Sequence, residues 1–183
     1  VCILHAGIFV WKGRGKMNNY RTHNCNELSL KNVGETVKLA GWVQTIRNLG
    51  GMKFIDLRDE KGITQIVVSE NIDLKDVTKE CTITVTGDVV ERSSKNDKIL
   101  TGEIEVVAKS ITVLGKCRSA LPFEVNIEGQ NVREDLRLEY RFLDLRNEKI
   151  HNNIKLRSKI LKDFRKTMDE LEFTEIQTPI LAN

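Results

Sequence analysis

Phe54 is the residue whose position best suits a binding role. In 52-MKFIDLR-58, strand alternation places Ile55 and Leu57 on one face and Phe54 on the other, together with Asp56. Two interpretations of this phenylalanine are open. It is either a partly covered core aromatic, the commoner position for phenylalanine, or a stacking platform for unpaired bases on the open face of a small barrel. Taken alone, Phe54 fits the first interpretation better.

Polar residues in the neighbouring segments favour the second interpretation. Arg47 ends one strand pattern, Gln65 is central in another, and Glu105 alternates with apolar residues in a third. A guanidinium can bind phosphate or a base, an amide can pair with a base edge, and a carboxylate can accept from an exocyclic amine. Each could also be an ordinary solvated strand residue. Together with Phe54 they could line one groove, and Arg92, before the 93–102 loop, is a weaker candidate for a phosphate contact.

The sequence offers no catalytic or metal-binding constellation. It lacks G-x-S-x-G, H-E-x-x-H and a phosphate-binding loop. Its four cysteines form no C-x-x-C pair, and its three histidines are widely spaced. We therefore predict no catalytic residues, no metal site and no cofactor in these 183 residues. The cysteine usage suits a reducing compartment, so we expect a cytoplasmic protein.

The net charge of +3 arises at the N-terminus. The chain has 29 Lys and Arg and 26 Asp and Glu, and residues 1–16 carry three bases and no acid. Residues 17–183 are therefore neutral, which excludes the bulk basic surface of a non-specific nucleic-acid binder. We interpret 1–16 as an upstream extension outside the fold, with a weak membrane or organelle address as the alternative. No apolar run reaches the ~20 residues of a membrane span, so no membrane partner is expected.

The segments that position these residues read as β-strands and then as helices. Gly41 interrupts the first strand pattern at a point where a bend or bulge is possible. Strands are predicted at 36–47, 52–58, 63–69, 82–92 and 103–114, with a brief helix at 72–80. This is the element order of an OB-fold, a five-stranded Greek-key barrel, and the alternative is an unclosed five-stranded meander.

After residue 114 the pattern changes. Residues 115–132 read as a linker, and helical spacing begins at Glu134. A longer helix then ends near Glu172, followed by a predicted strand over 173–181 that contains Pro179. Two helices and one strand cannot bury the apolar stripe of the longer helix, so this part is an incomplete domain.

Several of these segments together resemble a known family. The run 41-GWVQTIRNLGGMKFIDLRDEKGITQIVV-68 resembles the anticodon-binding OB domain of bacterial-type aspartyl-tRNA synthetases, which are class II aminoacyl-tRNA synthetases. The segments 20-YRTHNCNEL-28, 102-GEIEV-106 and 136-LRLEYRFLDLR-146 match in order and spacing, and 173-FTEIQTPIL-181 resembles motif 1 of the family. The resemblance implies an OB-fold anticodon-binding domain at 17–114, a linker and hinge at 115–147, and the start of an α+β catalytic domain at 148–183.

The resemblance also implies roles for individual residues. Phe54 would stack on the middle anticodon base and Gln65 would pair with it, while Arg47 and Glu105 would contact the anticodon loop, Glu105 at the first base. Pro179 matches the motif 1 proline at the dimer interface. The sequence departs from the family at 44-QTI-46, where a run of arginines is common, and at 147-NE-148, where a proline is usual.

The resemblance implies an aspartate–tRNA ligase that uses ATP and Mg²⁺ and forms a homodimer. Motifs 2 and 3, which bind ATP, Mg²⁺ and aspartate in this family, do not occur in 1–183, so we expect this stretch alone not to aminoacylate. Two alternatives are a free-standing RNA-binding module and a non-functional truncated remnant.

Overall fold

The computed structural model describes residues 2–4, 7–9, 19–97, 99–117, 121–125 and 132–176. The chain divides into two compact units, 1–119 and 120–183. The first contains a five-stranded barrel and, as a separate sheet, the short antiparallel pair β1 (Cys2–Leu4) and β2 (Gly7–Phe9). This pair lies in the segment predicted to be an extension outside the fold, and the rest of 1–18 lies outside the described residues.

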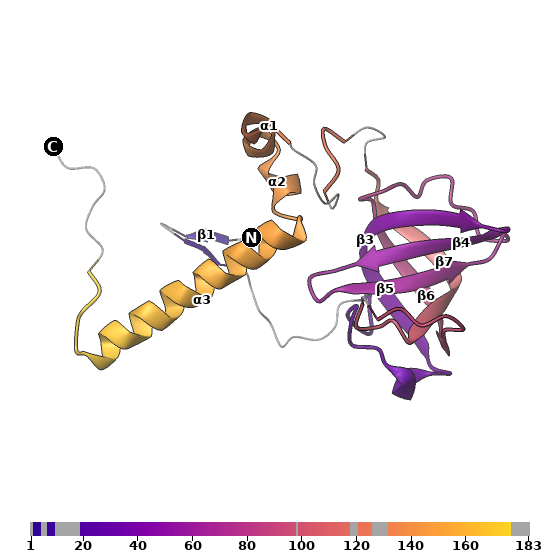
Figure 1. The fold of residues 1–183 in the computed structure, drawn as a ribbon, viewed down its shortest axis with the longest axis horizontal. Helices are drawn as coiled ribbons and strands as arrows, with labels where there is room; N and C mark the ends of the chain where they lie inside the picture. The colour runs from indigo at the N-terminus through magenta and orange to yellow at the C-terminus, as the bar shows by residue number, and fades with distance from the viewer. Residues whose placement is uncertain are drawn as a thin grey trace. The chain divides into compact units, whose positions relative to one another are not determined.

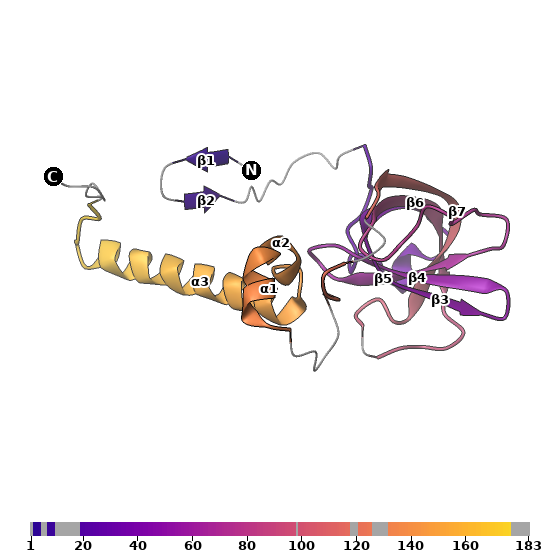
Figure 2. The same cartoon turned by 90° about the horizontal axis from the view of Figure 1, so that it is seen from above.

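The barrel is closed, as Figures 1 and 2 show, with the strand order β3-β4-β5-β7-β6. All its pairs are antiparallel except that of β5 with β7. This arrangement confirms the predicted OB-fold over the unclosed meander. Its strands are β3 (Thr36–Leu49), β4 (Met52–Arg58), β5 (Ile63–Val68), β6 (Thr82–Glu91) and β7 (Ile104–Gly115).

Alternating side chains fill the barrel interior. On β4, Ile55 and Leu57 are fully buried, and Ile66 and Val68 on β5 and Val106 on β7 occupy the same core. Because side chains alternate along a strand, the residues between them lie on the outer face. The outer side of β4, β5 and β7 is therefore set by the same pattern that builds the core.

Gly41 allows β3 to pair on both of its edges. The first half of β3 pairs with β6 and its second half with β4, with a register shift between Val43 and Thr45. A Cβ atom at position 41 would lie 2.3 Å from the backbone oxygen of Arg58. The close approach of β4 to β3 thus requires glycine here. The bulge that the sequence allowed at Gly41 lies further along β3, between Val43 and Thr45.

The prediction of a helix over 72–80 is wrong, because this segment forms successive turns. The backbone N–H of Val77 donates to Leu74, and the Asp73 carboxylate accepts from the backbone N–H of Lys75. A side chain that bonds its own backbone competes with helix formation, and so short a helix is marginal in isolation. Val77 is buried and contributes to the barrel core.

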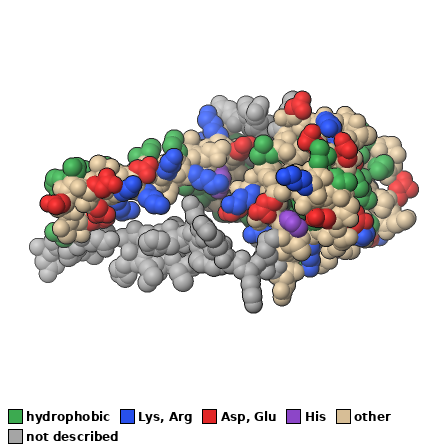
Figure 3. Space-filling model, turned by 90° about the horizontal axis from the view of Figure 1, so that it is seen from below, with side chains coloured by type: hydrophobic (Ala, Val, Ile, Leu, Met, Phe, Trp, Pro, Cys, Tyr) green, Lys and Arg blue, Asp and Glu red, His purple; other side chains and the backbone are tan. Residues whose placement is uncertain are grey.

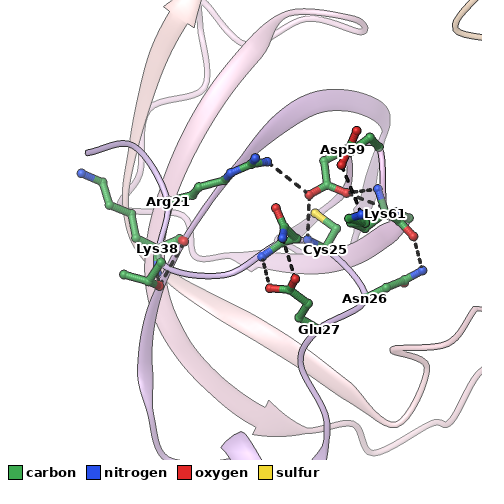
Figure 4. Close-up of polar contacts among 11 residues, drawn as sticks. Arg21, Cys25, Asn26, Glu27, Lys38, Asp59 and Lys61 are labelled. Atoms are coloured by element: carbon green, nitrogen blue, oxygen red, sulfur yellow. Dashed lines mark hydrogen bonds and ion pairs between the residues drawn. The ribbon is translucent and has the colours of Figure 1, made fainter. Parts of the chain in front are cut away.

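A clamp at Asp59 holds the segment before the barrel against the turn between β4 and β5. Figure 4 shows the carboxylate accepting from the backbone N–H of Cys25 at 2.9 Å, of Lys61 at 2.7 Å and of Gly62 at 3.1 Å. The Arg21 guanidinium lies 3.7 Å away. Burial raises the pKa of Asp59, and burial together with the neighbouring Asp59 charge raises the pKa of the Cys25 thiol to about 12. The Cys25 thiol is therefore protonated at neutral pH.

The raised pKa of Asp59 predicts a pH-dependent stability. The folded state binds this proton more tightly than the unfolded state, whose pKa is close to 3.8. The tighter binding of this proton adds to the free energy of unfolding. This contribution is fully present below about pH 3.8 and is lost as the pH rises through the pKa of Asp59 in the folded state. Urea unfolding of wild type and Asp59→Asn over a pH series should show the stability of wild type, relative to the variant, falling as pH rises. A relative stability that grows over this range would contradict the prediction.

The second unit is helical where it is described. Its helices are α1 (Glu134–Glu139), α2 (Arg141–Asp144) and α3 (Glu148–Glu170). The helical segment predicted to begin at Glu134 is therefore two short helices, which meet at Tyr140. Arg137 and Arg141 both bond the buried carboxylate of Asp144, and Arg137 Nε lies 2.8 Å from Asp144 Oδ1.

Asn147, which stands where the family usually has proline, caps α3. Its side-chain oxygen accepts from the backbone N–H groups of Lys149 at 3.1 Å and Ile150 at 3.3 Å. Its amide nitrogen donates to the backbone oxygen of Val125 at 2.8 Å. Glu148 follows in the first turn, where a negative charge is favourable. This departure from the family pattern therefore preserves the start of the helix.

Large apolar side chains remain exposed along α3, including Ile154, Leu161 and Phe164. The longer helix is confirmed, and the chain turns at 171–172 as expected. Residues 173–176 form no strand, and the remainder of the predicted 173–181 strand, with Pro179, lies outside the described residues. Among the helices of the described ranges, none is long and apolar enough to cross a membrane.

Candidate nucleic-acid interface

Phe54 lies on the outer face of the barrel, in the middle of three adjacent strands. It pairs with Arg47 on β3 and with Val67 on β5, and Val67 in turn pairs with Val107 on β7. Phe54 is partly exposed and Val107 is 38% exposed. The outer face thus carries a short apolar strip that is open to a flat, unpaired base at Phe54 and Val107, whereas Val67 between them is only 3% exposed.

A chain of polar contacts runs beside this strip. Arg47 Nη2 donates to Asp56 Oδ1 at 2.8 Å and to Gln65 Oε1 at 3.2 Å. Gln65 Nε2 donates to Glu105 Oε2 at 3.0 Å, and the Thr45 hydroxyl donates to Asp56. Asp56 pairs directly with Gln65 across β4 and β5. The structure therefore brings Arg47, Gln65 and Glu105 together, as the sequence predicted.

Arg92 completes this chain at its far end. Its Nε lies 3.9 Å from Glu105 Oε2, and 12% of its side chain is exposed. Nη1 of Arg92 is buried and makes no hydrogen bond within the described residues. This burial favours a role beside Glu105 over the phosphate contact expected from the sequence. We call the set Asp56, Arg47, Gln65, Glu105 and Arg92 the polar row.

Asp56 was not among the site residues predicted from the sequence. The sequence did indicate the position of its side chain, because Asp56 alternates with Ile55 and Leu57 and so shares the outer face with Phe54. Which residue it would bond could not be known before the pairing of β3 with β4 and β5 was established. Thr45 was noted only as part of a departure from the family pattern.

A buried ion pair lies on the same face of β4, two residues beyond Asp56. Arg58 Nη2 donates to both carboxylate oxygens of Glu80, at 2.9 Å and 3.0 Å. The two side chains are 12% and 5% exposed. Gln44 on β3 accepts a weaker bond from Arg58 at 3.4 Å. Since both charges are buried and mutually satisfied, the pair joins the 72–80 turns to β4 and serves the fold.

Charges of both signs are interspersed on the face shown in Figure 3. This distribution agrees with the neutral sequence of 17–183. Recognition on such a surface depends on local stacking and hydrogen bonding, with a small contribution from long-range attraction. Within the ranges that the structure describes, no group of three His, Cys, Asp or Glu could hold a metal ion.

Comparison with known families identifies both units. An OB-fold nucleic acid binding domain matches residues 37–114, and a domain of class II tRNA synthetases (D, K and N) matches residues 133–183. The fold and the site thus define a nucleic-acid-binding OB domain followed by part of a class II synthetase domain. The predicted fold class is confirmed.

The curated relatives narrow the family further. The chain is 49% identical over 173 residues to an aspartate–tRNA(Asp/Asn) ligase of Rickettsia canadensis, covering 91% of this chain and 28% of that protein. It is 46% identical over 172 residues to an aspartate–tRNA ligase of Streptomyces avermitilis, covering 91% of this chain and 29% of that protein. The chain is therefore a homologue of aspartate–tRNA ligases over 91% of its own length, as predicted, and spans less than a third of the length of these relatives.

Solved structures show the same fold. The asparaginyl-tRNA synthetase of Pyrococcus horikoshii matches with a TM-score of 0.71 and 26% identity, over 87% of this chain and 38% of that one. The aspartyl tRNA synthetase of Entamoeba histolytica matches with a TM-score of 0.73 and 24% identity, over 83% of this chain and 38% of that one.

Proposed function

We propose that this chain recognises the anticodon loop of aspartate tRNA as part of an aspartate–tRNA ligase. The observation that carries the proposal is the outer face of the barrel, where Phe54 lies directly beside Arg47 and the polar row continues through Gln65 to Glu105. An aromatic ring offers stacking to any base, and the polar side chains supply the donors and acceptors that distinguish one base from another.

Each residue of this face has a proposed role. Phe54 stacks on the middle anticodon base and Gln65 pairs with the edge of that base. Glu105 accepts from the first base, and Arg47, which is half exposed, contacts the loop. The uncharged residues 44-QTI-46 stand where arginines are common in the family, so Arg47 provides the positive charge of this strand end.

The activity of the whole ligase is part of the same proposal. The enzyme would join aspartate to ATP with release of pyrophosphate, and then transfer the aspartyl group to the 3′ end of the tRNA with release of AMP. Mg²⁺ would neutralise charge on the ATP phosphates. We route no step of this chemistry through residues 1–183, whose proposed contribution is tRNA recognition in the cytoplasm.

Dimer formation through α3 and Pro179 belongs to the proposal as well. The exposed apolar side chains of α3 support it, because a monomer in water gains nothing from leaving Leu161 and Phe164 uncovered.

Binding to isolated anticodon stem-loops tests the proposed recognition. The 1–183 chain should bind a stem-loop with the aspartate anticodon GUC about tenfold or more tightly than one with the phenylalanine anticodon GAA, because each mismatched contact costs about 1–3 kcal/mol. Fluorescence anisotropy at one fixed salt concentration measures both affinities. Equal affinity for the two loops would reject anticodon recognition and would favour a general RNA-binding module.

A further inference from the structure

A bulge at Gln44 changes which side chains of β3 lie on the outer face of the barrel. The pairs on either side of the bulge are Val43 with Leu57 and Thr45 with Asp56. Gln44 therefore has no residue opposite it in β4. Strict alternation from the buried Val43 would place Thr45 inside the barrel. Instead, Gln44 and Thr45 both bond outer-face side chains of β4.

The bulge decides the face on which Arg47 lies. After Gln44 the alternation resumes one residue later, so Ile46 packs against the core and Arg47 pairs with Phe54 on the outer face. A continuous ladder through Gln44 would exchange the positions of Ile46 and Arg47, because a one-residue shift moves every side chain of a strand to the other face. The guanidinium proposed to contact the anticodon loop would then point into the barrel.

Glu80 closes a ring of contacts around this bulge. Its backbone N–H donates to the backbone oxygen of Val43 at 2.7 Å. Its carboxylate oxygens accept from Arg58 Nη2 at 2.9 Å and 3.0 Å. Arg58 Nη1 in turn donates to Gln44 Oε1 at 3.4 Å, which returns the ring to the residue after Val43. We call Glu80 and Arg58 the bulge bracket.

The backbone of Glu80 has a conformation that is unusual for a residue with a side chain. Its φ is 61°, in the left-handed region that residues other than glycine rarely adopt. Such a conformation persists only where the surrounding contacts fix it, and it is typical of functional positions. Glycine would adopt it without strain, so the contribution particular to glutamate is the carboxylate that bonds Arg58.

We propose that Glu80 is a positioning residue for RNA binding, because it holds the Gln44 bulge through Val43 and Arg58 and thereby keeps Arg47 on the outer face. Glu80 need not touch the RNA, since its side chain is only 5% exposed. This role is additional to joining the 72–80 turns to β4. The inference rests on the proposed anticodon recognition, in which Arg47 contacts the loop.

A double-substitution cycle tests the bulge bracket. Fluorescence anisotropy measures the affinity for the GUC stem-loop of wild type, Arg47→Met, Glu80→Ala and the combined variant. In the wild-type background, Arg47→Met should weaken binding by about fivefold or more. In the Glu80→Ala background the same substitution should weaken binding less, by a factor of about 2 to 10, because Arg47 is no longer held toward the RNA. Equal effects in the two backgrounds would overturn the proposal, since a purely stabilising role of Glu80 leaves the contribution of Arg47 unchanged.

Asp59→Ala is the matched control. Asp59 is also a buried carboxylate and is next to Arg58 in the sequence, but it bonds backbone N–H groups of the segment before the barrel and of the β4–β5 turn. In the Asp59→Ala background, Arg47→Met should have the same effect as in wild type. A reduced effect there would show that loss of any buried carboxylate lowers the contribution of Arg47, and the proposal would be wrong.

Deletion of Gln44 separates positioning from stability. Without the extra residue, Thr45 follows Val43 directly and regular alternation already places Arg47 on the outer face. The bracket then has no bulge to hold. Glu80→Ala in the chain that lacks Gln44 should therefore leave the effect of Arg47→Met at its wild-type value. An effect that stays reduced would mean that Glu80 acts on Arg47 by another route, which contradicts the proposal.

The outcomes separate the bulge bracket from the proposed function. If wild type prefers the GUC loop to the GAA loop but Arg47→Met has equal effects with and without the Glu80 carboxylate, anticodon recognition stands and the bracket is overturned. If wild type shows no preference between the loops, or if Arg47→Met has no effect in wild type, the bracket is overturned together with the proposed recognition or the proposed role of Arg47.

Circular dichroism establishes that each variant is folded. Should Glu80→Ala fail to fold, Glu80→Gly decides by the same comparison, because glycine adopts the φ of position 80 without strain. Should the chain that lacks Gln44 fail to fold, the cycle and its Asp59→Ala control decide.

Discussion

Phe54→Ala is expected to weaken binding of the aspartate anticodon stem-loop by about 1–3 kcal/mol, which is roughly 5- to 150-fold in the dissociation constant. The ring is partly exposed beside Arg47 and Val67, so a base that stacks on it would lose most of its apolar contact. Titration of labelled stem-loop with each purified protein measures the change.

Two further variants test whether stacking is the cause. Phe54→Tyr keeps the flat ring and should retain most of the affinity, whereas Phe54→Leu keeps an apolar side chain without a ring and should resemble Phe54→Ala. Leu49→Ala removes an exposed apolar side chain from the same β3–β4 hairpin and serves as the control, with little effect expected. If the variants with Leu and Ala at position 54 bind as tightly as wild type, the base-stacking role of Phe54 is wrong.

Arg58→Met is expected to lower the free energy of unfolding by about 3–5 kcal/mol. The substitution leaves the Glu80 carboxylate, which is 5% exposed, without the guanidinium that bonds both of its oxygens. Removing the opposite charge from a buried ion pair is strongly destabilising, and the expected loss is a large part of the roughly 5–15 kcal/mol typical of a domain. Urea denaturation followed by circular dichroism measures it.

The control for this prediction is an exposed ion pair with the same shortest nitrogen–oxygen distance, 2.9 Å. Lys116 Nζ lies 2.9 Å from Asp76 Oδ1, with the two side chains 68% and 64% exposed. Lys116→Met should cost less than about 1 kcal/mol, because water screens and solvates both charges. Adding Glu80→Gln to Arg58→Met should recover part of the loss, since it removes the buried negative charge that the Arg58 guanidinium had balanced. Equal effects of Arg58→Met and Lys116→Met would show that burial does not strengthen the Arg58–Glu80 pair.

Much of the barrel could be predicted because its strands follow a local rule. Alternation along 52–58 separates the buried Ile55 and Leu57 from the outer-face Phe54, and the structure has the same division. The long helix that begins at Glu148 could also be predicted, since its apolar residues recur at helical spacing. The helix predicted over 72–80 was wrong for another local reason. The Asp73 carboxylate accepts from the backbone N–H of Lys75, and this contact favours a turn over a helix.

The contacts of the candidate site could be predicted only in part. The sequence indicated that Arg47, Gln65 and Glu105 share a face with Phe54, but it gave no reason to join Gln65 to Glu105. That contact depends on β5 and β7 lying parallel and adjacent, with Ile66 opposite Val106. The Arg58–Glu80 ion pair could not be predicted either, because it forms only where the 72–80 turns pass beside β4.

By itself, the sequence indicated the homologous enzymes, the strand faces and the residues proposed for base recognition, because side-chain alternation and the motif around 41–68 are properties of short segments. Tertiary structure alone decided which of those residues bond one another. Pairing between strands distant in sequence set the order Asp56, Arg47, Gln65, Glu105, Arg92, and with it the donor and acceptor that Gln65 presents. Hydrogen bonds act only over about 3 Å, so their partners are fixed by the closed barrel.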